Sequence, residues 1–96
     1  MFVVEVNYVR PLTDVDAHIA AHRIFLAEQY AKGTFFASGP KEPRTGGIIL
    51  ARAESPEELM AVLALDPFQV HGVAEYRVTQ FHVRAAGEGL EQLVGA

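Results

Sequence analysis

The stretch FVVEVNYV, residues 2–9, decides the fold because its side chains alternate between two environments. One face of the predicted strand is wholly apolar and carries Phe2, Val4, Val6 and Tyr8. The other face is mixed and carries Val3, Glu5, Asn7 and Val9. This period of two is typical of a strand that packs one face on a core. We therefore predict a strand over residues 2–9, which Arg10-Pro11-Leu12 ends.

An amphipathic helix is predicted next, over residues 14–32. Thr13 is its expected N-cap, and the acidic residues that follow it lie where the helix dipole favours negative charge. Gly33 is a natural residue to follow the helix, because glycine adopts a left-handed conformation at little cost. The next elements are predicted as a strand at residues 34–39, a turn at 40–45 and a strand at 46–53.

A second helix begins at Ser55-Pro56-Glu57-Glu58, where Ser55 is the N-cap, Pro56 the first helical residue and Glu58 the partner in a capping box. This helix is expected to end near Asp66, because the residue before Pro67 is pushed out of the helical conformation.

The last strand is predicted over residues 73–83. Its apolar phase changes between Val78 and Phe81, which indicates a bulge or a frayed end there. Residues 85–96 form a tail rich in glycine and alanine that could hold a short helix.

The predicted order is therefore βαββαβ, the ferredoxin-like arrangement of the α+β class, in one domain over residues 1–84 with a tail at 85–96. Two helices would cover one face of a four-stranded antiparallel sheet. The other face has no cover within the chain, and half of all residues are hydrophobic. We expect two copies of the chain to pack through this open sheet face as a homodimer, a dimeric α/β-barrel.

Composition excludes several classes of function. The net charge is −4 and lysine and arginine form no cluster, which argues against nucleic acid and anionic membranes as partners. There is no cysteine for a disulfide, a thiolate nucleophile or a zinc ribbon. The first residues resemble neither a signal peptide nor a membrane anchor, so a cytoplasmic location is expected. No phosphate-binding loop, nucleophile elbow or dinucleotide fingerprint is present, and we predict no cofactor.

Histidine is the notable residue type on the first predicted helix. His22 falls in the middle of an apolar stripe formed by Val15, Ile19, Leu26 and Tyr30. A buried ring there needs a hydrogen-bond partner, so His22 is either a core histidine bonded to a carbonyl group or a functional residue. His18 lies one turn earlier, and such a pair can chelate zinc or copper. Without a third ligand in the sequence, no metal site is predicted.

Two short motifs could add to a site. Asp66, before Pro67, would place a carboxylate at the unfavourable C-terminal end of a helix, or would bond a nearby backbone N–H in a turn. Ser38-Gly39-Pro40 ends a strand and is, taken alone, most simply a bend. Arg44 and Arg52 could bind an anion, but solvated surface charges are the simpler interpretation.

Taken together, these motifs resemble those of the YCII-related family in order and spacing from about His22 to Phe81. The matching residues are His22, Gly33, Ser38-Gly39-Pro40, Gly47, Ser55-Pro56-Glu57-Glu58, Asp66-Pro67-Phe68, Gly72 and Phe81. The chain departs from the pattern at Ile19, where many relatives carry an arginine three residues before the histidine.

The resemblance implies a ferredoxin-like dimer with a cleft in each subunit and a His–Asp catalytic pair, which here would be His22 and Asp66. Ser38, Gly39 and Pro40 would then bind the substrate. The expected function is cofactor-free proton transfer, of lyase or isomerase type, on a small organic acid or phenol, ring compounds included. The alternative is a non-catalytic dimeric module that binds or senses a small metabolite through the same cleft. RNA binding through the sheet is disfavoured by the acidic charge and the missing aromatic motif.

Overall fold

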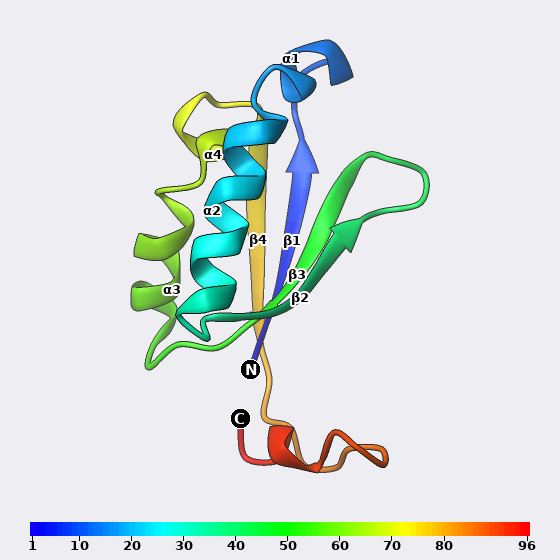
Figure 1. Cartoon of the computed structure of the whole chain (residues 1–96), viewed down its shortest axis with the longest axis vertical. Coiled ribbons are helices and arrows are strands. Elements are labelled where there is room, and N and C mark those ends of the chain that lie inside the picture. The colour runs from blue at the N-terminus through cyan, green and yellow to red at the C-terminus, as the bar shows by residue number, and fades with distance from the viewer.

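The computed structural model describes residues 1–96, the whole chain. Its elements are β1 (Phe2–Tyr8), α1 (Leu12–Asp16), α2 (Ile19–Ala31), β2 (Phe35–Pro40), β3 (Gly46–Ala51), α3 (Pro56–Leu63), α4 (Pro67–Val70), β4 (Ala74–Gln80) and a 3₁₀ turn, η1 (Glu91–Leu93). The four strands form one antiparallel sheet in the order β2-β3-β1-β4. This order, with the helices on one face of the sheet (Figure 1), is the α+β ferredoxin-like fold that the sequence predicts.

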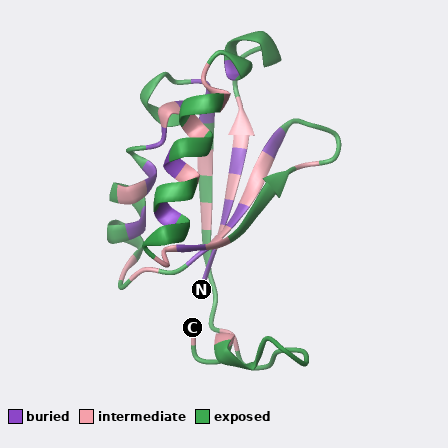
Figure 2. Ribbon diagram, viewed as in Figure 1, coloured by how far each residue is buried: buried purple, intermediate pink, exposed green.

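The core lies between the helices and the face of the sheet that β1 supplies with Phe2, Val4 and Val6. These side chains are buried, whereas the residues between them are only partly covered, as the alternation predicts. Leu59 and Leu63 of α3 and other apolar residues complete the core from the helical side. In Figure 2 the buried bands accordingly lie along the strands and on the sides of the helices that face them.

The first predicted helix is wrong in one respect, because it is two helices rather than one. Thr13 does not cap it, since Pro11 precedes the first helical residue and its carbonyl oxygen accepts from the N–H groups of Asp14 and Val15. The run of helical residues is then interrupted at His18, whose φ of −115° and ψ of 5° lie outside the helical range. The His18 N–H bonds the Val15 carbonyl in a tighter 3₁₀ pattern, and α2 starts beyond it. The end of α2 is as predicted, with Gly33 at a φ of +77°.

The second helix starts at the predicted residues, with Ser55 as N-cap and Pro56 as the first helical residue. The Ser55 hydroxyl accepts from the Glu58 N–H at 3.1 Å, as predicted, but the Glu58 carboxylate accepts from the N–H of Glu54 instead of that of Ser55, so the capping box is only half formed. The helix ends at Leu63, earlier than expected, and a separate turn, α4, follows Asp66.

The strand ends also differ from the predictions. β3 ends at Ala51 and β4 at Gln80, and β4 pairs with β1 in unbroken register. The predicted change of phase near Val78 is therefore the end of the strand. A register shift does occur, but between Phe35 and Ala37 of β2.

The second face of the sheet has no helix over it (Figure 1), as the sequence predicts. Val3, Ile48 and Leu50 lie partly exposed on this face and are called the open-face patch below. Residues 85–96 run away from the sheet and contain only η1. None of the helices has the length and apolarity that crossing a membrane would require.

Candidate functional site

A pocket of about 330 Å³ lies between α2 and the hairpin formed by β2 and β3. Its walls include apolar side chains from β1 and α2, such as Val6 and Leu26. The pocket is lined by four residues that the sequence nominates, His22, Ser38, Gly39 and Pro40. In the sequence, the end of α2 and a turn lie between His22 and the other three. The structure thus brings together four of the five residues that the sequence nominates.

The fifth residue, Asp66, lies directly behind His22. Its Oδ1 accepts a hydrogen bond from Nδ1 of His22 at 2.8 Å, across 44 positions of sequence. Asp66 is completely buried, whereas the His22 side chain is 12 % exposed and reaches the pocket. The predicted contact between the two side chains is therefore present, and only the histidine faces the pocket.

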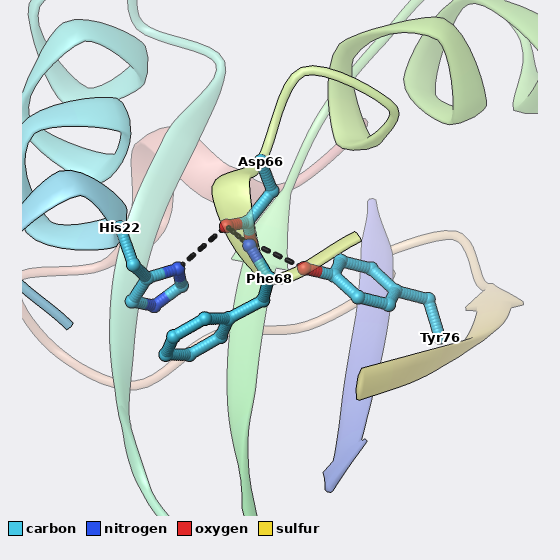
Figure 3. A network of polar contacts seen from close by, with 4 residues as sticks. All are labelled: His22, Asp66, Phe68 and Tyr76. Atoms are coloured by element: carbon cyan, nitrogen blue, oxygen red, sulfur yellow. Dashed lines mark hydrogen bonds and ion pairs between the residues drawn. The ribbon is translucent and has the colours of Figure 1, made fainter. Parts of the chain in front are cut away.

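The fold holds the Asp66 carboxylate through three hydrogen bonds. Asp66 is the N-cap of α4, where its Oδ1 also accepts from the backbone N–H of Phe68 at 3.0 Å. Its Oδ2 accepts from the hydroxyl of Tyr76 on β4. Figure 3 shows His22 and Tyr76 approaching the carboxylate from opposite sides. The view that Asp66 sits unfavourably at a helix end is wrong, because the residue begins the next helix and its side chain caps the free N–H group of Phe68 there.

Tyr76 is a site residue that the sequence reasoning missed. Burial, followed by the negative charge of Asp66, raises the pKa of Tyr76 well above its usual range, so its hydroxyl stays protonated and donates. A signal was available in the sequence. Ala74, Tyr76 and Val78 alternate within the strand, and a tyrosine that faces a core needs a partner for its hydroxyl group.

These contacts fix the tautomer of the neutral His22 ring. A carboxylate can only accept, so Nδ1 carries a proton, and in the neutral ring Nε2 is the nitrogen with the free lone pair. The ring also stacks on Phe68, with centroids 3.9 Å apart and planes 7° from parallel. The imidazole is therefore held both by a hydrogen bond along its edge and by packing against its face.

Ser38 contributes a hydroxyl group to the opposite wall of the pocket. Its Oγ is hydrogen-bonded to the hydroxyl of Tyr30 at the end of α2. Next to it the two strands approach closely, because a Cβ on Gly47 would lie 2.9 Å from the carbonyl oxygen of Gly39. The Ser38-Gly39-Pro40 stretch is thus both the end of a strand and part of the pocket wall.

The two arginines singled out in the sequence differ. Arg44 lines the pocket and donates to Asp16 at 2.5 Å, while its guanidinium lies 5.8 Å from the centre of the Tyr8 ring. The hydrogen bond between them, more than their charges, lowers the pKa of Asp16 and raises that of Arg44. Arg44 is exposed, as expected of a surface charge, but it also lines the pocket. Arg52 lies over Phe36 and does not line the pocket.

His18 takes no part in the pocket. Its ring stacks on that of His71, with centroids 3.9 Å apart, rather than turning toward His22. The Nδ1 atom of His22 is engaged by Asp66, so the two histidines of the pair point to different partners. No group of three or more histidine, aspartate or glutamate side chains is placed to hold a metal ion.

Comparison with known proteins places these features in context. A solved structure similar to this one is 5-chloro-2-hydroxyhydroquinone dehydrochlorinase (TftG) from Burkholderia phenoliruptrix AC1100, in complex with 2,5-dihydroxybenzoquinone. The two share a TM-score of 0.72 and 23% sequence identity over 86% of this chain and 95% of that chain, a likeness that establishes the fold. No curated protein matches the sequence. The model of the YCII-related domain matches residues 1–82, and the chain therefore belongs to the YCII-related family.

Proposed function

We propose that this protein is a small enzyme that transfers protons on a small organic acid or phenol, with His22 as the general base and acid. One observation carries the proposal: a fully buried carboxylate fixes Nδ1 of His22, while the same ring lines a pocket. General acid–base catalysis needs a base that is oriented by a hydrogen bond at one nitrogen and is free to meet the substrate at the other.

The proposed chemistry follows from this orientation. Nε2 of His22 takes a proton from a carbon atom of the substrate, and the Asp66 carboxylate stabilises the imidazolium ion that forms. The electron pair left on carbon either expels a leaving group, as in a lyase, or moves along a conjugated system. In an isomerase, Nε2 then returns the proton at another atom. The step moves protons and an electron pair only, so it requires no cofactor.

The remaining residues have supporting roles in this proposal. Ser38 is a hydrogen-bond donor to a substrate oxygen, and the backbone of Gly39 and Pro40 shapes the wall beside it. Asp66 and Tyr76 are positioning residues, because neither lines the pocket and both act through the His22 ring.

The relative of known structure supports this class of substrate. By its name, TftG removes the elements of hydrogen chloride from a hydroxyhydroquinone, and its structure holds a dihydroxybenzoquinone. Such an elimination requires a base that accepts a proton. The pocket of this chain, at about 330 Å³, is at the lower end of the range for small-molecule sites and fits a single substituted ring.

The experiment is a search for turnover with chlorinated and hydroxylated phenols, quinols and unsaturated lactones, monitored by absorbance. On a substrate so identified, His22→Gln should lower kcat by roughly 10²–10⁴-fold. Asp66→Asn should lower kcat with little change in KM, because the ring would lose the charge that stabilises its protonated form. His82→Gln, at an exposed histidine outside the pocket, is the matched control and should retain full activity.

Full activity of His22→Gln on an identified substrate would contradict the assignment. Tight binding of members of the panel without turnover, unchanged in Asp66→Asn, would favour the alternative function, a module that binds or senses a small metabolite.

A further inference from the structure

The side chains that line the pocket have a different charge balance from the chain as a whole. The chain carries a net charge of −4, whereas the charged residues that line the pocket, apart from His22, are Arg23, Arg44 and Asp16. Two cations against one anion leave the lining with an excess of positive charge, and the Asp66 carboxylate lies outside the lining, where it is paired with His22. A pocket with apolar walls concentrates such a field and attracts small anions.

Arg44 is held in a defined position at the pocket. It lies in the loop between β2 and β3, and its guanidinium is fixed by Asp16 on one side and the Tyr8 ring on the other. An ion pair between exposed side chains adds little to stability, so stability does not account for this arrangement. The contact with Asp16 uses one terminal nitrogen, Nη2, and the rest of the planar group remains available for a carboxylate or phenolate.

Arg23 supplies the second positive charge. It follows His22 directly on α2 and lines the pocket, and no carboxylate lies within ion-pairing distance of it. A cation without a protein partner beside an apolar cavity is well suited to bind an anionic ligand.

A row of aromatic contacts joins the arginine end of the pocket to His22. His22 stacks on Phe68, Phe68 meets Tyr8 edge to face with centroids 5.9 Å apart, and Tyr8 lies under Arg44. All four side chains line the pocket. A flat ring is the ligand shape that packs best on such a wall, because aromatic groups favour stacked and edge-on contacts.

We propose that the pocket takes a small aromatic anion, whose acidic group is bound by Arg44 and Arg23 and whose ring lies along Tyr8 toward His22. The part that assigns the ring to His22 for reaction rests on the proposed function, whereas the binding itself does not. Arg44 is thus a specificity-determining residue that selects substrates with an ionised carboxylate or phenolate group.

Binding of benzoate, measured by calorimetry and by NMR of backbone amides, tests this inference. Benzyl alcohol lacks the charge and acetate lacks the ring, so each should bind at least tenfold more weakly than benzoate. Arg44→Gln should weaken benzoate binding by about tenfold or more, the effect expected for one lost hydrogen bond to a charged group, and should leave benzyl alcohol unaffected. Arg23→Gln should act in the same direction. Arg52→Gln removes the same charge outside the pocket and should change nothing.

The inference is overturned if benzoate fails to bind at millimolar concentration, if it binds no better than benzyl alcohol, or if Arg44→Gln has no more effect than Arg52→Gln. The two proposals have different readouts, since Arg44→Gln is judged by the binding of benzoate and His22→Gln by the turnover of an identified substrate. If benzoate binding depends on Arg44 but no substrate is turned over, the anion site is supported and the proposed enzyme function is contradicted. If turnover depends on His22 but benzoate binding does not depend on Arg44, the enzyme function is supported and the anion site is contradicted.

Discussion

The substitution Tyr76→Phe tests how firmly the fold holds the carboxylate behind His22. It removes one hydroxyl group and leaves Oδ2 of the fully buried Asp66 without its donor. A hydrogen bond to a charged group contributes about 1.5–3 kcal/mol, so the free energy of unfolding at pH 7 should fall by about that amount. Urea denaturation followed by circular dichroism measures this loss.

The loss should also depend on pH, in a direction fixed by the pKa of Tyr76. Burial and the charge of Asp66 raise this pKa in the folded protein, whereas in the unfolded chain the group ionises near its ordinary value of 10.0. Above about pH 10, the folded wild type therefore binds one proton more than the unfolded chain and loses stability by about 1.4 kcal/mol per pH unit. The phenylalanine variant has no such proton. Its deficit relative to the wild type should shrink at this rate as the pH rises above 10.

Tyr30→Phe is the matched control, because it deletes the same hydroxyl group from a tyrosine that is 39% exposed and bonded to the neutral Ser38. Its effect on the free energy of unfolding at pH 7 should be clearly smaller than that of Tyr76→Phe. A deficit for Tyr76→Phe no larger than for Tyr30→Phe, or one that stays constant up to pH 11, would refute the reasoning, since Tyr76 would then ionise in the folded protein as it does in the unfolded chain.

Three further predictions concern the scaffold. Gly46→Ala should destabilise the fold by about 1–3 kcal/mol or more, because its Cβ would lie 1.8 Å from the carbonyl oxygen of Val6. Gly39→Ala is the control, since a Cβ there meets nothing within 4 Å. Equal losses of unfolding free energy for the two variants in urea denaturation would contradict this prediction. Removal of residues 85–96, which contribute nothing to the core cluster, should change the Tm by no more than about 4–8 °C, and a larger fall in calorimetry would show that the tail stabilises the domain. If two copies pair through the open-face patch, sedimentation velocity should find a dimer of the wild type and a folded monomer of Leu50→Glu. A wild type that is monomeric at tens of micromolar would exclude this pairing.

The fold could be predicted because its signals are local. The alternation in β1 and the Ser55-Pro56 start of α3 each depend on neighbouring residues only, and the order of elements then leaves few topologies. The contact between His22 and Asp66 is different. Nothing in the spacing of two residues 44 positions apart indicates that they meet, and the pairing was predicted from the family resemblance alone.

Some features were missed although the sequence contained a signal. Asp66-Pro67 has the same form as Ser55-Pro56, a capping residue followed by proline at the first helical position, and it does begin a helix. The position of Arg44 had no such signal. It depends on the path of a loop and on an ion pair with α1, and neither leaves a pattern in the residues around it.

Asp66 shows why the structural and functional interpretations of this motif are not alternatives. A carboxylate offers about four lone-pair positions, so it can cap α4, accept from Tyr76 and hold His22 at the same time. Burying the charge would be costly without these donors, and each of them offsets part of that cost. The cap and the tyrosine fix the carboxylate, and the fixed carboxylate in turn fixes the His22 ring. Because Phe68 supplies both the N–H group for the cap and the ring that stacks on His22, the beginning of one short helix determines the geometry of the site.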